Sequence, residues 1–412
     1  MPVETHLNDS IVIIGGGHAA AQLCGGLAAA GLAARAHLVC EEPDLPYHRP
    51  PLSKAYLKDA AETLQPLRSE AWYAEAGITV HRADAAVAIH PGACTVQLHS
   101  GLELSYTTLV LATGTRARQL PHLPEALRNV ATLRTAADAA RLRTLLADGQ
   151  PLTVLGGGFI GLEIAATARA LGHTVTVLES APRLLMRSVS PELSAHVLQT
   201  HSASGMHIRL GVAVGHFETE GDRLTALTVD GQRHAVGLLV LGLGAVAEHT
   251  LASAAGLVCD NGIVVDACMR TSDPHILAIG DCTSFPESHS GRRLRLESVQ
   301  NANDQARSAV TTLTGNEVPH TALPWFWSEQ GSLRLQMAGL VPQHAQDASR
   351  HRRPGATPAS FSVLHYLGEK LVCVESVNTP LDHMAARKLL EIGKSPAPAV
   401  ACDAATPLKN LL

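Results

Sequence analysis

Two stretches of the chain repeat one strand, turn and helix pattern, and this repeat restricts the possible folds more than any other feature. In residues 11–42, four apolar residues lead into a glycine-rich turn, an alanine-rich stretch follows, and a second apolar run ends in acid. Residues 151–180 have the same order. Each stretch is typical of a βαβ unit whose helix N-terminus faces a phosphate. The repeat predicts an α/β protein with two Rossmann-like domains, each binding a dinucleotide.

The spacing of the glycines in both turns fits the pattern G-x-G-x-x-G/A. The first turn has Gly15 and Gly17, with Ala20 in the third position. The second turn has Gly156, Gly158 and Gly161. The first glycine permits the tight turn, the second lets a pyrophosphate approach the backbone, and the small third residue lets the helix pack on the strand. The strand, turn and helix context makes both turns candidate phosphate sites.

An acidic residue closes each βαβ unit and suggests which coenzyme binds. Glu41 and Glu179 lie near the expected distance of ~20 residues after the turns, where a carboxylate accepts hydrogen bonds from a ribose 2′-hydroxyl. A 2′-phosphate is repelled there, so Glu179 favours NADH over NADPH. The alternative for both acids is a plain strand end in solvent, and nearby Arg183 is a residue type that accommodates a 2′-phosphate.

The order of motifs along the 412 residues predicts three domains. A buried strand at 109–112 leaves the first domain, and strands near 238–241 and 275–279 lead back into it. The composition then changes, with two of the three tryptophans close together, two strand-like runs and a helical run. We expect a discontinuous first domain (1–116 and 245–320), a second domain (117–244) and a C-terminal α+β domain (321–412). The tail after Pro396 should be loosely held.

Composition and charge exclude several function classes. The net charge of −5 is spread along the chain, which argues against a nucleic-acid-binding protein. We also expect no membrane span and no metal site, because the chain has no long apolar run, no C-x-x-C pair and no ligand-like histidine spacing. The polar N-terminal stretch MPVETHLNDS lacks the features of a signal peptide, so we expect a cytoplasmic protein. Most of the eight cysteines should be buried small hydrophobes.

With LVLATG and ILAIGDC between and after the two turns, the chain resembles the flavin-dependent pyridine-nucleotide oxidoreductases of the glutathione-reductase fold. The segments HRPPLSKAYL, LRSEAWYAEAGI, LRTAADAARLR, LESVQNANDQAR and PWFWSEQ narrow the resemblance to NADH-dependent ferredoxin reductases of the putidaredoxin reductase type. It extends over roughly residues 10–395. The resemblance implies FAD in the first domain and NADH in the second.

The resemblance also implies which residues hold the cofactors. For FAD these are Gly15, Gly17, His18, Ala19, Ala20, Glu41, Arg49, Lys54, Ala86, Thr113, Gly114, Arg134, Asp281, Val299 and Trp325. For NADH they are Gly156, Gly158, Phe159, Ile160, Gly161, Glu163, Glu179, Gly242 and Gly244.

Lys54 and Glu163 are the candidate catalytic residues, since they resemble an ion pair beside flavin N5 that stabilises the charge arriving with hydride. The alternative for Glu163 is an ordinary polar helix residue. YHRPPLSK contains no cysteine where disulfide reductases of this fold carry a redox dithiol. Electrons should therefore leave the flavin for an external acceptor. The sequence departs from the family at Ala20, in place of glycine, and at Ala247, in place of proline.

The implied function is electron transfer from NADH through FAD to a 2Fe-2S ferredoxin, which feeds a cytochrome P-450 or a Rieske oxygenase. Alternatives of the same fold are a rubredoxin reductase and an NADH oxidase. An alternative of another class is a redox-controlled binding module like apoptosis-inducing factor.

Ferredoxins are generally acidic, so the docking surface should be basic. Trp325 and Trp327 are placed at the flavin edge by the resemblance, with the core of the C-terminal domain as the alternative. The candidate docking residues, each alternatively an ordinary surface charge, are Arg68, Arg292, Arg293, Arg295, Arg307 and Lys388.

Overall fold

The computed structural model describes residues 10–121, 123–124, 127–342 and 348–412. Residues 1–9, on which most of the signal-peptide argument rests, lie outside this part. The described residues form two compact units. The first lies within Met1–Arg49, Leu64–Arg116 and Val246–Ala322, and the second within Pro50–Thr63, Ala117–Ala245 and Leu323–Leu412. No helix in the described ranges is long and apolar enough to cross a membrane.

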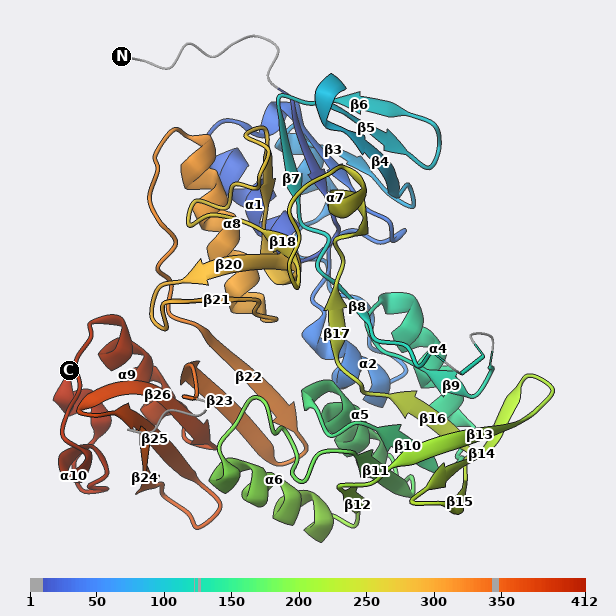
Figure 1. The fold of residues 1–412 in the computed structure, drawn as a ribbon, viewed down its shortest axis with the longest axis vertical. Helices are drawn as coiled ribbons and strands as arrows, with labels where there is room; N and C mark the ends of the chain where they lie inside the picture. The colour runs from blue at the N-terminus through green and yellow to red at the C-terminus, as the bar shows by residue number, and fades with distance from the viewer. Residues whose placement is uncertain (1–9, 122, 125–126, 343–347) are drawn as a thin grey trace. The chain divides into compact units, whose positions relative to one another are not determined.

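A five-stranded parallel sheet, of which β3 and β7 are labelled in Figure 1, forms the centre of the first unit. Its strand order is β19-β7-β1-β2-β3. The first glycine turn follows β1, at the point where the chain order reverses between β2 and β7. Ligands of open α/β sheets bind at such a point, beyond the carboxyl ends of the strands. The five strands are β1 (Ile11–Ile14), β2 (Ala36–Val39), β3 (Thr79–His81), β7 (Thr108–Leu111) and β19 (Ile276–Ala278).

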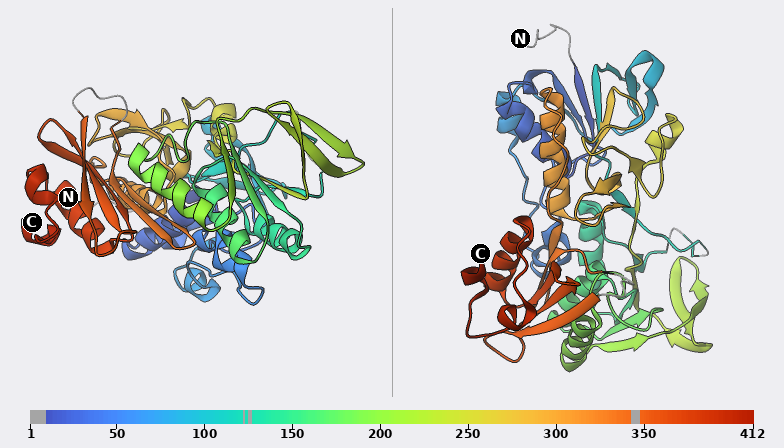
Figure 2. Two further views of the ribbon diagram at one scale, coloured as in Figure 1. Left: turned by 90° about the horizontal axis from the view of Figure 1, so that it is seen from below. Right: turned by 60° about the vertical axis from the view of Figure 1, so that its left-hand side comes forward.

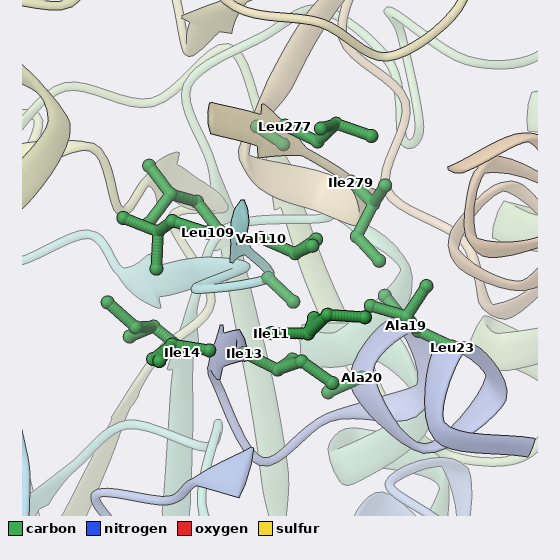
Figure 3. Packing of buried hydrophobic residues seen from close by; sticks show 14 of the residues in the cluster. Ile11, Ile13, Ile14, Ala19, Ala20, Leu23, Leu109, Val110, Leu277 and Ile279 are labelled. Carbon is green, nitrogen blue, oxygen red and sulfur yellow. The ribbon is translucent and has the colours of Figure 1, made fainter. Parts of the chain in front are cut away.

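Apolar side chains on both faces of this sheet make the core of the first unit. Ile11 and Ile13 lie beside Ala20 and Leu23 of α1, while Ile14 points to the opposite face (Figure 3). Burial on both faces explains why β1 is a continuous apolar run rather than an alternating one. Helix α8 packs against α1 (Figure 2). The helices of this unit are α1 (His18–Ala29), α3 (Glu70–Glu75), α7 (Thr250–Ala254) and α8 (Val299–Leu313).

Smaller sheets complete the first unit. One is the antiparallel set β4 (Ala86–His90), β5 (Thr95–Leu98) and β6 (Glu103–Ser105). Another comprises β18 (Ile263–Val264), β20 (Thr283–Glu287) and β21 (Arg292–Leu294). Where the chain passes from one unit to the other, β8 (Thr115–Ala117) pairs with β17 (Ala245–Ala247).

The second unit repeats the plan with a parallel sheet in the order β12-β11-β10-β16-β9. The second glycine turn follows β10, again where the chain order reverses. The predicted α/β class with two Rossmann-like sheets is confirmed. The strands are β9 (Val130–Ala131), β10 (Leu152–Leu155), β11 (Val175–Glu179), β12 (His207–Leu210) and β16 (Leu238–Leu241).

Helices and a projecting meander surround this second parallel sheet. The helices are α2 (Ala55–Lys58), α4 (Ala136–Ala147), α5 (Phe159–Ala170) and α6 (Pro191–Ala203). The meander extends away from the parallel sheet in both views (Figures 1 and 2) and comprises β13 (Val214–Glu220), β14 (Arg223–Val229) and β15 (Gln232–Ala235).

The C-terminal part is an antiparallel sheet in the order β22-β23-β26-β25-β24, with α9 packed on one face (Figure 1). This matches the predicted α+β character of the part, while the predicted domain bounds stay a prediction. Its elements are β22 (Trp325–Gln330), β23 (Leu333–Gly339), β24 (Ala348–Pro354), β25 (Phe361–Leu367), β26 (Lys370–Val377), α9 (Pro380–Glu391) and α10 (Pro398–Ala401).

The expectation of a loosely held tail after Pro396 is wrong. The buried guanidinium of Arg353 donates to the carbonyl oxygens of Ala401 at 3.0 Å, Asp403 at 2.6 Å and Thr406 at 3.1 Å. Leu408 is buried in the C-terminal cluster. The tail is ordered because the buried guanidinium of Arg353 donates hydrogen bonds to three of its carbonyl oxygens. The position of the tail in the sequence does not reveal these bonds.

Candidate functional site

The first glycine turn has the geometry that a pyrophosphate cradle requires. Gly15 has a φ of 131°, and a Cβ there would lie 2.2 Å from the carbonyl oxygen of Ala112, so only glycine fits. At Gly17, the N-cap of α1, no described atom beyond its own stretch of chain lies within 4 Å of the place a Cβ would take. Ala20 is fully buried against the sheet. The helix N-terminus is thus open to an anion, and this turn fits the diphosphate of FAD.

The second turn has the same construction. Gly156 has a φ of 109°, and a Cβ there would lie 2.3 Å from the carbonyl oxygen of Gly242. A Cβ on Gly161 would lie 2.7 Å from the Gly156 oxygen, so helix α5 approaches the turn too closely for any side chain. At Gly158 the nearest described atom would be 3.8 Å away. The turn therefore leaves room at its second glycine, where a pyrophosphate is expected.

The acid of the second βαβ unit is fixed by the turn beside it. Oε2 of Glu179 accepts a hydrogen bond from the Gly157 amide at 2.5 Å, and Oε1 accepts one from the Ala181 amide at 2.7 Å. The guanidinium of Arg183 donates to the carbonyl oxygens of Met186 at 2.7 Å and Val189 at 2.9 Å. Glu179 is thus held at the turn, while Arg183 donates hydrogen bonds to two backbone carbonyl oxygens.

The corresponding acid in the first unit has an unexpected neighbour. Glu41 is exposed after β2. Next to it, Glu42 pairs with Arg49 at 2.7 Å and accepts a hydrogen bond from Tyr47 at 2.6 Å. Sequence reasoning did not single out Glu42, because no motif marks this position. It holds Arg49, one of the residues expected at FAD.

The two candidate catalytic side chains meet within the second unit. Lys54 Nζ lies 2.6 Å from Oε2 of Glu163, whose side chain is 4% exposed. Lys54 also donates to the carbonyl oxygen of Pro50 at 3.1 Å. Glu163 is located on α5 just after the glycine turn, and Lys54 is located between η2 (Pro50–Ser53) and α2. Lysine and glutamate make an ion pair whose carboxylate is buried, and its role beside the flavin stays a prediction.

Two serines that sequence reasoning missed complete the surroundings of this pair. The Ser53 hydroxyl donates to Oε2 of Glu163 at 2.5 Å, and the Ser328 hydroxyl donates to Oε1 at 2.7 Å. Both serines are buried. A buried carboxylate is costly without such donors, so these hydroxyls are part of what allows Glu163 to lie there.

Several other expected FAD residues belong to the first unit. His18 and Ala19 begin α1, Asp281 lies in the turn Gly280–Cys282, and Val299 begins α8. The Thr113 hydroxyl donates to the carbonyl oxygen of Glu248 at 2.5 Å, and the Gly114 carbonyl accepts from the Glu248 amide at 2.9 Å. Ala86 begins β4.

Lys54, Arg134 and Trp325 lie in the second unit. Arg134 precedes α4, and its amide donates to Asp138 at 2.9 Å. Trp325 packs at the edge of the C-terminal cluster, with the Arg387 guanidinium 4.2 Å above its ring. This supports the alternative that Trp325 contributes to the C-terminal core.

The expected NADH residues surround the second turn. Phe159 and Ile160 are the first residues of α5, and the Phe159 ring meets Phe326 edge to face with centroids 4.8 Å apart. The side chain of Ile160 is 49% exposed. Gly242 touches the turn after β16, and Gly244 has a φ of 84° two residues later.

The candidate docking residues differ in their exposure and in their interaction partners. Arg293 donates to the carbonyl oxygens of Val265 and Ser284, and Arg295 is 12% exposed in a pair with Glu297. Both have partners within the first unit, and Arg293 is nevertheless exposed. Arg307 on α8 is 58% exposed beside Asp304, and Lys388 on α9 is 57% exposed. Both remain accessible, as do Arg68 and Arg292.

The prediction that most cysteines are buried is wrong, because only four of the eight are buried: Cys24, Cys40, Cys282 and Cys373. The other four, Cys94, Cys259, Cys268 and Cys402, are partly exposed. All eight thiols are free. Burial raises the pKa of Cys24 and of Cys40 to about 12, so both stay protonated at neutral pH. Within the described ranges, no cluster of three or more His, Cys, Asp or Glu residues could hold a metal ion.

Comparison with known families identifies this arrangement. Residues 9–306 match the model of the family described as pyridine nucleotide-disulphide oxidoreductase. The chain belongs to the pyridine nucleotide-disulphide oxidoreductases. Residues 325–412 of this oxidoreductase match a second model, described as reductase C-terminal. The chain is therefore a flavoprotein oxidoreductase whose cofactors are FAD and NAD(H).

Relatives of this oxidoreductase match it over nearly its whole length. Rhodocoxin reductase of Rhodococcus erythropolis is 41% identical over 97% of this chain and 93% of its own. Putidaredoxin reductase of Pseudomonas putida is 39% identical over 98% of this chain and 97% of its own.

Solved structures agree with this match. The ferredoxin reductase for the CYP199A2 system from Rhodopseudomonas palustris is 41% identical, with a TM-score of 0.92 over 98% of this chain and 99% of its own. The reductase in the covalent putidaredoxin reductase–putidaredoxin complex is 38% identical, with a TM-score of 0.92 over 98% of each chain. The predicted family and fold are confirmed.

Proposed function

We propose that this oxidoreductase transfers electrons from NADH through FAD to a 2Fe-2S ferredoxin that feeds a cytochrome P-450. The observation that carries the proposal is the full-length similarity to reductases named for rhodocoxin, putidaredoxin and terpredoxin, and to the ferredoxin reductase for the CYP199A2 system. Rhodocoxin, putidaredoxin and terpredoxin reductases are 39–41% identical over at least 97% of this chain. A Rieske oxygenase is the second candidate acceptor, because the reductase component of an anthranilate 1,2-dioxygenase system is 37% identical.

Bound FAD supplies the chemistry that links a two-electron donor to one-electron acceptors. The chain's own residues bind and orient the cofactors and compensate the charge that arrives with hydride. The open N-terminus of α1 at Gly17 fits the FAD diphosphate, and the open N-terminus of α5 at Gly158 fits that of NADH. Lys54 is the cation we assign to the negative charge that arrives with hydride, with Glu163 holding its ammonium in place.

We assign cofactor-binding roles to the residues that the sequence predicted, except Trp325, whose contacts favour the C-terminal core, and we add Glu42, which holds Arg49. The FAD-binding domain then comprises residues 1–116 and 245–320, and the NAD-binding domain residues 117–244. The C-terminal α+β domain comprises residues 321–412. NADH is a cytoplasmic reductant, so we place the enzyme in the cytoplasm.

The preference for NADH follows from two side chains of the second unit. Glu179 presents a carboxylate where the adenosine ribose is expected, and a 2′-phosphate would meet its negative charge. Arg183 already donates to two backbone carbonyls, so recruiting it to a phosphate costs those hydrogen bonds. Both observations favour NADH.

Two other functions of the same fold and one of another class make different predictions. A rubredoxin–NAD reductase is 34% identical, which is lower than the 39% of putidaredoxin reductase. An NADH oxidase would consume oxygen rapidly without any iron-sulfur protein. A redox-controlled binding module would show slow flavin reduction by NADH.

One assay separates these functions. The purified FAD-loaded protein is supplied with NADH and cytochrome c, with and without putidaredoxin as the 2Fe-2S probe. We expect cytochrome c reduction that depends on putidaredoxin and little oxygen uptake. Equal rates with and without putidaredoxin, or a preference for rubredoxin, would contradict the proposal.

A further inference from the structure

A buried chain of hydrogen bonds leads from helix α6 to the ion pair. Nε2 of His201 lies 2.8 Å from Oε1 of Gln330, and Nε2 of Gln330 donates to the Ser328 hydroxyl at 3.1 Å. Ser328 then donates to Oε1 of Glu163 at 2.7 Å. All four side chains are at most 4% exposed, and all belong to the second unit.

The donors and acceptors of these side chains give each of the three hydrogen bonds one direction. The Ser328 proton points to Glu163, so the Ser328 oxygen must accept from the Gln330 amide. The Gln330 oxygen then faces His201, whose Nε2 must carry a proton. Burial lowers the pKa of His201, which keeps its ring neutral at neutral pH. All three donors therefore point towards the carboxylate of Glu163.

The two oxygens of Glu163 have different partners. Lys54 and Ser53 donate to Oε2, whereas Ser328 donates to Oε1. Rotation of the carboxylate about its terminal bond would break the Ser328 bond and misalign the other two. Ser328 thus fixes the plane of the carboxylate, and Gln330 and His201 fix Ser328.

We propose that Ser328 is a positioning residue for hydride transfer, held in its working orientation by Gln330 and His201. It acts through Glu163, by keeping the carboxylate aligned with the ammonium of Lys54. The amide of Gln330 does not relay protons, so the chain orients and polarises rather than conducts. This inference rests on the proposed function of the Lys54–Glu163 pair.

The test is anaerobic stopped-flow reduction of the FAD-loaded enzyme by NADH. Ser328→Ala and Ser328→Cys remove the strong donor, and cysteine keeps the size of the side chain. We expect the limiting rate of flavin reduction to fall about tenfold in both, as for the loss of one hydrogen bond to a charged group. The NADH concentration for half-maximal rate should stay within about twofold, because Ser328 does not touch the coenzyme in this account. Gln330→Met should slow the same step by about threefold, since it acts one bond further away.

A matched control and a double-mutant cycle exclude a merely structural role. Ser376 is buried in the same sheet and bonds to Ser362 at 3.1 Å, away from Glu163. Ser376→Ala should keep the wild-type rate. In a Glu163→Gln background, Ser328→Ala should cost less than about twofold, because a residue that acts through Glu163 has little left to act on.

The outcomes separate this inference from the proposed function. A wild-type flavin that NADH does not reduce would overturn the proposed function. A wild-type flavin that is reduced normally, with Ser328→Ala and Ser328→Cys at wild-type rates, would overturn the role of Ser328 alone. Full additivity with Glu163→Gln would also overturn it.

Discussion

Nζ of Lys54 lies 2.6 Å from Oε2 of Glu163, although the two are 109 positions apart in the chain. The contact joins the segment Pro50–Thr63 to helix α5, both within the second unit. Burial of the carboxylate and its two serine donors make this a preorganised charge pair rather than a surface salt bridge.

Glu163→Gln should slow flavin reduction by NADH about a hundredfold, because the neutral amide no longer holds the ammonium of Lys54 where charge develops. Stopped-flow decay of oxidised-flavin absorbance measures this rate. The control is Glu329→Gln, which changes an exposed glutamate on β22. A wild-type rate in Glu163→Gln would remove the pair from the mechanism.

Glu179→Gln should weaken the preference for NADH. The substitution removes the negative charge that repels a 2′-phosphate, so the ratio of kcat/KM for NADH to that for NADPH should fall at least about tenfold. Steady-state kinetics with both coenzymes give the ratio, and Glu220→Gln on exposed β13 is the control. An unchanged ratio would contradict the role of Glu179.

Arg307→Glu should raise the KM for putidaredoxin several-fold at low salt and reduce its salt dependence, since the exposed guanidinium faces an acidic partner in this account. Reduction of ferricyanide by NADH should not change. Arg128→Glu, at an exposed arginine of the second unit, serves as the control. Equal effects of both substitutions would point to overall charge rather than to a docking surface at α8.

Arg353→Met should destabilise the protein by about 3–5 kcal/mol, because it leaves Asp382 and three tail carbonyls without their cation. Thermal unfolding and limited proteolysis of the tail measure the effect. Arg350→Met should cost less than about 1 kcal/mol, since its pair with Glu192 is exposed. Similar losses of stability for both variants would contradict the role of Arg353 in holding the tail.

Stability should fall as pH drops from 6.5 to about 4, in part because of His383. Burial, followed by Arg387 and Arg334, lowers the pKa of His383 from 6.5 to about 4. In that window the unfolded ring is protonated and the folded ring is neutral, so acid favours unfolding by up to about 3 kcal/mol. His383→Phe should make urea unfolding less sensitive to pH there, while exposed His216→Phe should not. Equal pH dependence in wild type and His383→Phe would exclude this contribution.

The sequence predicted best what depends on backbone geometry. Gly15 and Gly156 could be found because positive φ and close carbonyls demand glycine, and their spacing is preserved in one continuous stretch. The acid Glu179 could be found from its distance of ~20 residues after the second turn. The Lys54–Glu163 pair required a resemblance, because nothing in either local pattern points to the other.

What the sequence did not predict depends on side chains from separate elements. Ser328 and Gln330 alternate along β22 and are both buried, and polar residues at inward-facing positions of a strand are the signal that could have drawn attention to them. Their partners on α5 and α6 become visible only once the sheet is placed against these helices. The hydrogen bonds from Arg353 to the tail carbonyls were missed for the same reason.

Single-turnover electron transfer tests the central claim most directly. The FAD-loaded enzyme is reduced anaerobically with one equivalent of NADH and mixed in the stopped flow with oxidised putidaredoxin. The account predicts rapid flavin reduction by NADH, followed by oxidation of the flavin as two equivalents of the ferredoxin are reduced. A flavin that NADH reduces but that stays reduced in the presence of the ferredoxin would contradict it.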